Sequence, residues 1–187
     1  QRRWLLTGAV SLAGFCGCQW LAARPPASLT VIPVNGGMAT YFRDLGKSSE
    51  WLMDCGATNS VEFIAKPFLR ARGVNYLPAL ILTHGDLRHI GGAGLIAEIF
   101  HTRQILVSPL RLRSPTYRQL IQEFERRPQW LRRISSGDRL GPWMVLHPSA
   151  EDRFGQADDG ALVLSGRFYD TRVLLLSDLG RAGQNAL

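Results

Sequence analysis

The feature that most constrains the fold is an apolar run at residues 77–83, which shows no alternation of apolar and polar side chains. A strand of this kind is buried on both faces, so a layer must pack on each side of its sheet. Apolar and β-branched runs that predict further strands lie at residues 29–34, 38–42, 51–53, 105–107, 143–146, 161–164 and 171–176. Helical spacing of apolar residues predicts helices over 60–72, 91–100 and 116–130, the last interrupted at Pro128. The pattern predicts an α/β fold in which stacked sheets are covered by helices.

Size and composition agree with a folded domain. The chain has 187 residues, of which 45% are hydrophobic and 20% charged. These values exclude a disordered chain, a collagen-like chain and a coiled coil. Three cysteines do not make a disulfide framework.

The N-terminal segment is apolar and separate in character. Residues 4–23 carry no charge, and a helix of that length covers ~30 Å, the thickness of a bilayer core. Arg2 and Arg3 precede this segment, and an Arg-Pro-Pro sequence at 24–26 follows it. We predict a transmembrane helix and linker over 1–26 and a globular domain over 27–187. The arginine bias puts the N-terminal side in the cytoplasm and the domain outside.

Two other interpretations of the N-terminal segment stay open. Arg2-Arg3 before an apolar run resembles a twin-arginine signal, which makes a signal peptide the stronger of the two. The segment would also suit a buried core helix.

The candidate chemistry follows the buried strand. His84, Asp86 and His89 lie within six residues of the loop that begins at Thr83. Open α/β sheets place ligands at the carboxyl ends of their strands. Histidine nitrogens and carboxylate oxygens are the usual ligands of zinc, and manganese favours the oxygens. An ordinary polar loop with one capping aspartate is the alternative.

Two more aspartates end predicted strands. Asp178 follows the apolar run at 173–176 and is a candidate to bind or bridge a metal ion, or else to cap a helix that starts near Leu179. Asp54 ends another strand before Gly56, and we expect it to hold its loop by accepting backbone hydrogen bonds.

An arginine-rich segment suggests a second kind of function. Residues 103–139 hold nine arginines against three acidic residues, within a chain of net charge +7. Because guanidinium groups bind phosphates and aromatic rings stack on bases, the segment predicts contact with single-stranded DNA. A solvated helix face, or contact with anionic lipid head groups, is the alternative. The arginines proposed for DNA are Arg118, Arg126, Arg127, Arg132 and Arg133.

The ordered set of motifs resembles a known family. Asp-x-Gly at 54–56 is followed by Thr-His-Gly-Asp-Leu-Arg-His at 83–89, Gly-Asp-Arg-Leu at 137–140, Asp-Asp-Gly at 158–160 and Leu-Ser-Asp at 176–178. This order is similar to the metallo-β-lactamase fold, and more narrowly to the C-terminal domain of ComEC-type competence proteins. In that family a last transmembrane helix and a Pro-containing linker precede the domain. The resemblance implies an αββα sandwich and a metal-dependent hydrolase that cleaves DNA during uptake at the bacterial inner membrane.

The resemblance also implies site residues. His84, Asp86 and His89 match the metal motif of the family, and Asp178 matches the aspartate that contacts both metals. Asp86 and His89 would be the catalytic residues, and the ion would be zinc or manganese. Single-stranded DNA, the membrane and other competence proteins are the expected partners, and the sequence gives no oligomeric state.

Three departures from the family pattern lower the expected number of metal ions to one. Arg88 stands in place of the second aspartate of the motif, and a guanidinium has no lone pair for a metal. Met38 stands where a glycine-rich turn usually has an aspartate. The final His-His-Gly-Ser segment has no counterpart, so we expect a sandwich that is incomplete at its C-terminus. We expect Arg88 to pair with Asp86 or Asp178 and to substitute for the missing cation.

These departures keep two further functions open. One is a non-catalytic domain that binds or guides single-stranded DNA. The other is an exported hydrolase of the same fold that acts on a small ester or amide.

Overall fold

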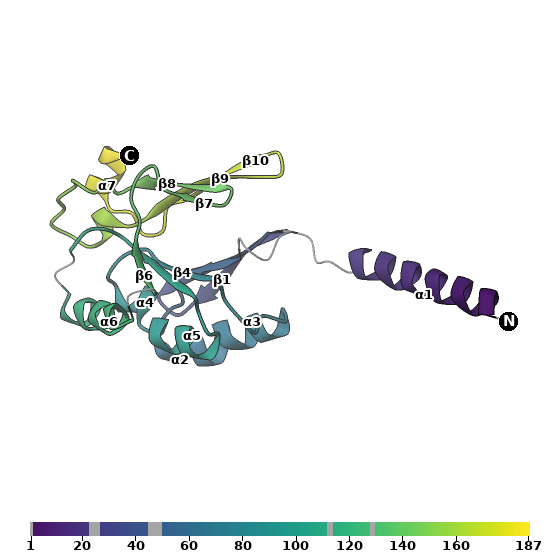
Figure 1. Cartoon of the computed structure of the whole chain (residues 1–187). Helices are drawn as coiled ribbons and strands as arrows, with labels where there is room; N and C mark the ends of the chain where they lie inside the picture. Colours follow the sequence, from purple (N-terminus) through teal and green to yellow (C-terminus); the bar gives the residue numbers. More distant parts are fainter. Residues whose placement is uncertain (1, 23–26, 45–49, 112–113, 128–129) are drawn as a thin grey trace.

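Two β-sheets are stacked on each other, with helices on the outer side (Figure 1). The computed structural model describes residues 2–22, 27–44, 50–111, 114–127 and 130–187. The first sheet has the order β1-β2-β3-β4-β5-β6; it is antiparallel from β1 to β3 and parallel from β3 to β6. Its strands are β1 (Ser28–Val34), β2 (Gly37–Arg43), β3 (Trp51–Met53), β4 (Ala79–Leu82), β5 (Gln104–Val107) and β6 (Leu131–Arg133). The second sheet is antiparallel, in the order β10-β9-β8-β7. Its strands are β7 (Arg139–Leu140), β8 (Trp143–His147), β9 (Val163–Phe168) and β10 (Thr171–Leu175).

Most helices cover the first sheet on the side away from the second (Figure 1). One continuous helical stretch lies over residues 58–71, and Pro67 falls just after its π-helical turn. The helical elements are α1 (Arg2–Ala22), α2 (Thr58–Ser60), the π-helical turn η2 (Val61–Ala65), α3 (Lys66–Ala71), α4 (Leu87–Ile90), α5 (Ala93–Ile99), α6 (Pro115–Glu125), the 3₁₀ turn η3 (Asp158–Gly160) and α7 (Arg181–Ala186).

The central strand β4 is buried on both faces, as its sequence predicts. Leu80 and Leu82 point into a core shared with the helices. Ile81, between them, points into a second core between the two sheets. Alternate side chains of one strand therefore serve two separate cores, which confirms the layered α/β architecture.

The core between the sheets is built around Trp143 of β8. This side chain is 1% exposed, and its ring centroid lies 5.4 Å from those of Phe42 and Trp51 in edge-to-face contacts. Such contacts add to the free energy gained from burying three large rings.

We expect Trp143→Ala to lower the free energy of unfolding by about 3–5 kcal/mol, because the cavity would lie between both sheets. Met144 is the matched control, since it is next on the same strand but points outward and is 36% exposed. Met144→Ala should cost no more than about 1 kcal/mol. Urea unfolding of the two variants measures the difference, and equal losses would contradict this description of the core.

The structure differs from the sequence expectations at several places, and the strand expected over 161–164, for example, is β9 at Val163–Phe168. The helix predicted over 116–130 ends at Glu125, while Pro128 lies outside the described residues. The short strands β6 and β7 have no clear apolar pattern, and we did not predict them.

The N-terminal segment is helical as α1, while the linker expected at 24–26 lies outside the described residues. Within the part of the chain that the structure describes, no helix combines the length and the apolar character needed to cross a membrane. The predicted transmembrane helix is therefore not confirmed.

Candidate metal centre

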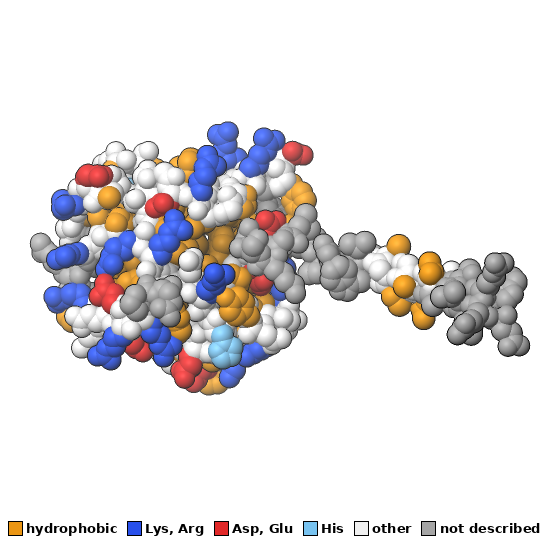
Figure 2. Space-filling view, viewed as in Figure 1, with side chains coloured by type: hydrophobic (Ala, Val, Ile, Leu, Met, Phe, Trp, Pro, Cys, Tyr) orange, Lys and Arg blue, Asp and Glu red, His pale blue; other side chains and the backbone are white. Residues whose placement is uncertain are grey.

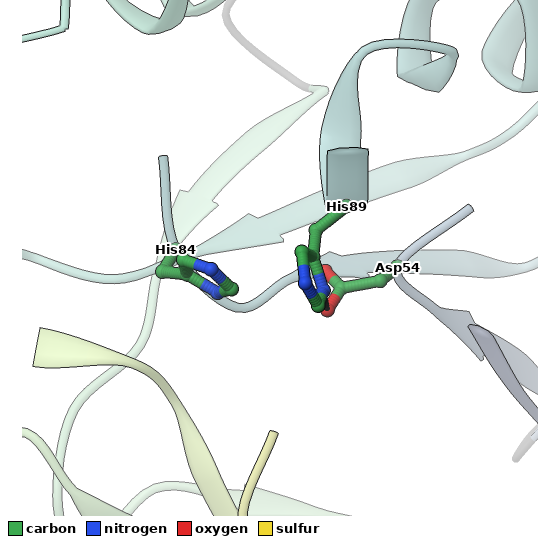
Figure 3. A group of neighbouring side chains, drawn as sticks. All are labelled: Asp54, His84 and His89. Atoms are coloured by element: carbon green, nitrogen blue, oxygen red, sulfur yellow. Dashed lines mark hydrogen bonds and ion pairs between the residues drawn. The ribbon is translucent and has the colours of Figure 1, made fainter. Parts of the chain in front are cut away.

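Three buried side chains converge at one edge of the first sheet (Figure 3). Asp54 follows β3 and His84 lies two residues beyond β4, while His89 belongs to the short helix α4. Because β3 and β4 are adjacent and parallel, their carboxyl ends meet at the same edge. One potential ligand atom from each of Asp54, His84 and His89 lies within 4.8 Å of the others. These three residues form the centre of a candidate metal site, in which each could either bind an ion or orient a residue that does.

The backbone fixes His89 in this position. Its carbonyl oxygen accepts hydrogen bonds from the N–H groups of Cys55 and Gly56, at 2.8 and 2.9 Å. On the other side, the β1–β2 turn comes so close that a Cβ on Gly37 would lie 2.9 Å from the Arg88 carbonyl oxygen and 3.3 Å from His89 Nε2. Glycine is therefore required at position 37 for the turn to approach the imidazole.

Hydrogen bonds set the tautomers of both histidines. The Asp54 carboxylate accepts bonds from the Thr83 N–H (2.9 Å), the Thr83 hydroxyl (2.6 Å) and His89 Nδ1 (3.3 Å). Because the Thr83 hydroxyl donates to Asp54, it accepts from His84 Nδ1 at 2.9 Å. With Nδ1 as the donor on each ring, Nε2 is the atom that each neutral imidazole would offer to a metal. Without a metal, His89 Nε2 donates to Asp178 Oδ2 at 3.1 Å, so that proton would have to leave before an ion binds.

Two partly exposed carboxylates complete the donor set. Asp178 Oδ2, just beyond β10, lies 3.1 Å from His89 Nε2, and Asp158 Oδ1 lies 3.7 Å from His84 Nε2. Two imidazole nitrogens facing two carboxylates suit zinc, and also manganese. The convergence expected of His84, His89 and Asp178 is therefore present, and the residues fit a divalent ion.

The surroundings shift the pKa values of the two histidines in opposite directions. Burial lowers the pKa of His84, which favours the neutral form that binds metals. The hydrogen bond to Asp54 raises the pKa of His89, so a metal would compete with a proton there.

Comparison with known proteins identifies the family. Residues 33–180 match the model of the metallo-beta-lactamase superfamily. The chain belongs to this superfamily. It is 28% identical over 154 residues to ComE operon protein 3 of Bacillus subtilis (strain 168), a match that covers 80% of this chain and 19% of that protein. The resemblance to ComEC-type proteins is thus confirmed, although the chain spans about a fifth of that relative.

Solved structures agree on the fold. The MIM-2 metallo-beta-lactamase gives a TM-score of 0.56 at 16% identity, covering 81% of this chain and 58% of that one. The native FEZ-1 metallo-beta-lactamase from Legionella gormanii also gives 0.56, at 10% identity, with coverages of 82% and 62%. At these identities the likeness concerns the metallo-β-lactamase fold alone.

In this metallo-β-lactamase domain, the Asp86 carboxylate is engaged by Arg88. The carboxylate caps α4 by accepting the Arg88 N–H at 2.9 Å, and it accepts Arg88 Nε at 3.0 Å. The pairing expected for Arg88 is therefore confirmed for Asp86. The Arg88 guanidinium lowers the pKa of that carboxyl to about 2. A role for Asp86 as ligand or catalytic residue stays a prediction.

The five arginines predicted to bind DNA lie on α6, on β6 and on the segment between them. Lysine and arginine side chains are scattered over the face of the domain in Figure 2 and form no single patch there. Arg132 pairs with Asp138 at 3.3 Å, and Arg133 pairs with Glu125 at 2.6 Å. Arg127 lies over the Trp130 ring. The remaining two, Arg118 and Arg126, are exposed at α6.

Sequence reasoning missed one member of this centre. It gave Asp54 the role of holding its own loop, whereas the backbone hydrogen bond that Asp54 accepts comes from Thr83, at the end of the neighbouring strand. The membership of Asp54 in the metal centre follows from the parallel pairing of β3 and β4. The available signal was that Asp54 and His84 each come just after an apolar strand.

Proposed function

We propose that this domain is a metal-dependent hydrolase that cleaves DNA during natural DNA uptake, in concert with other competence proteins. One observation carries the proposal: Asp178, which follows the last strand of the second sheet, places its Oδ2 atom 3.1 Å from His89 Nε2. The match to ComE operon protein 3 supports the uptake role. We further propose a location at the bacterial inner membrane with the domain on the outer side, which the charge bias at Arg2 and Arg3 supports.

In this proposal the residues divide into holding and orienting groups. His84 and His89, with Asp178 and Asp158, would hold one divalent ion. Asp54 would orient His89 directly and His84 through the Thr83 hydroxyl, because its oxygens already accept three hydrogen bonds. A bound ion would supply an activated water and would stabilise charge on the scissile phosphate.

The expected stoichiometry is one ion per chain. Arg88 carries a permanent positive charge beside Asp86 and offers no lone pair, so we expect it to exclude a second ion from that carboxylate. Elemental analysis after loading with zinc or manganese should give a single equivalent. Two equivalents per chain would contradict the proposal that Arg88 replaces the second ion.

A cleavage assay tests the activity itself. Single-stranded DNA is incubated with the chain in Mn²⁺ or Zn²⁺, with His84→Ala as the control. Cleavage by the wild type that is lost in His84→Ala supports the hydrolase. Binding without cleavage would instead favour the non-catalytic domain, for which the Arg88–Asp86 pair is the supporting observation. Hydrolysis of a small ester or amide, without affinity for DNA, would favour an exported small-molecule hydrolase of the same fold.

A further inference from the structure

We propose that a pocket at the amino-terminal ends of the parallel strands, opposite the metal centre, binds one nucleotide unit. The base of the nucleotide would stack on an aromatic ring, and its phosphate would bind arginine. The pocket has a volume of about 600 Å³. Its lining includes Tyr76, which precedes β4, the segment 101–104 that leads into β5, and Trp130, which precedes β6. All three lie at the amino-terminal ends of the parallel strands β4, β5 and β6, whereas the metal centre lies at the carboxyl ends of β3 and β4. Since β4 and β5 are four residues long, roughly 13 Å of strand separates the two sites.

Two guanidinium groups make the pocket suitable for a phosphate. Arg103 and Arg127 both line it. Among the described residues, neither forms an ion pair, in contrast to Arg132 and Arg133 nearby. Guanidinium groups that lack a carboxylate partner can bind phosphate oxygens without first breaking an existing pair. These two arginines are thus available where the paired ones are not.

Aromatic rings supply the surface for a base. The Arg127 guanidinium carbon lies 4.2 Å from the centroid of the Trp130 ring, which orders both side chains. Tyr76, also in the lining, is 47% exposed. A base of any identity can stack on the exposed ring of Tyr76, because every base has a π-face.

A buried hydroxyl in the lining points independently to a polar ligand. Thr102 is 1% exposed, and within the described part of the chain its Oγ1 has no hydrogen-bond partner. Leaving a buried hydroxyl without a partner is unfavourable, and such groups are uncommon in folded proteins. A polar ligand that enters the pocket would offer this hydroxyl a partner.

His101 adds a second sign of function. It follows the C-cap of α5 with a φ of 45°, a left-handed conformation that glycine usually supplies at this position. A non-glycine residue kept in a strained conformation is typical of a functional site. His101 lines the pocket, where its imidazole would contact the nucleotide.

The charge balance limits the ligand to a single phosphate. Glu98, from α5, also lines the pocket and is exposed. Its carboxylate would repel a chain of phosphates, but it can accept a hydrogen bond from a base amino group or a sugar hydroxyl. The chemistry therefore fits a nucleoside monophosphate or one residue of a single strand, and not a nucleoside triphosphate.

Binding is tested without metal, so that its failure and the failure of the hydrolase proposal are distinguishable. The full chain is titrated into a fluorescently labelled oligothymidylate of about 10 nucleotides, in EDTA at low salt, and anisotropy is recorded. Arg103→Ala and Arg127→Ala should each weaken binding roughly tenfold. Arg172→Ala is the matched control, because it removes the same charge from an exposed position on β10. It should change affinity by less than about twofold.

A glycine variant separates binding from folding. His101→Gly should raise the midpoint of thermal unfolding by about 2–4 °C, because it relieves the left-handed strain. The same variant should bind the oligonucleotide more weakly. A loss of binding in a more stable protein cannot come from unfolding.

The remaining outcomes decide the source of the ligand or overturn the proposal. Competition by thymidine monophosphate would assign the pocket to free nucleotides, and binding of the oligonucleotide alone would assign it to a strand. Equal losses in all three arginine variants would mean that only overall charge matters, and would overturn the pocket. So would a wild type that does not bind, or a His101→Gly variant that binds as tightly as the wild type.

Discussion

Replacement of either His84 or His89 by alanine is expected to abolish tight metal binding. Each variant removes an imidazole Nε2 that faces a carboxylate, so the loss in affinity should exceed the ~10–100-fold typical of residues that only orient a ligand. Competition with a chromogenic chelator for Zn²⁺ measures the affinities.

A third buried histidine provides the control for that experiment. His147 is 2% exposed and donates from Nε2 to the Asp159 carbonyl at 2.8 Å. His147→Ala leaves a similar cavity without removing a proposed ligand, so metal affinity should stay within about threefold of wild type. If all three alanine variants lose the metal equally, the loss reflects general destabilisation, and the proposed centre is wrong.

Asp54→Asn is expected to weaken metal binding by about 10–100-fold although, in our proposal, Asp54 does not hold the ion. An asparagine can still accept the Thr83 N–H bond through its oxygen. Its amide nitrogen is a donor and can accept a hydrogen bond from neither His89 Nδ1 nor the Thr83 hydroxyl, so the imidazoles lose the contacts that fix their tautomers. Isothermal titration with Zn²⁺ or Mn²⁺ gives the change.

The backbone does not complicate the Asp54→Asn experiment. Asp54 has a φ of 57°, and asparagine adopts this left-handed region more readily than most residues. Circular dichroism should therefore show a folded variant. Wild-type affinity in Asp54→Asn would show that this carboxylate neither orients the histidines nor binds the ion.

How much the sequence predicts depends on whether the determining contacts are local. The strand at β4 and the loop to His89 follow from residues next to one another, and both are present. The capping role of Asp86, kept open as the alternative, is also local, since it depends on the N–H of Arg88 two residues on. Nothing local reveals that Asp54 reaches His89, 35 residues away, because that depends on the pairing of β3 with β4.

The proposed ion would also link the two sheets to each other. Its ligands come from both layers, with the histidines at the edge of one sheet and Asp178 beyond the last strand of the other, where Ser177 Oγ also lies 2.9 Å from Thr83 Oγ1. A free metal concentration one hundred times the Kd would add about 2.7 kcal/mol to the free energy of unfolding. Local unfolding of the second sheet would pull Asp178 away from the histidines. Amide hydrogen exchange in β9 and β10 should therefore slow when the metal is bound.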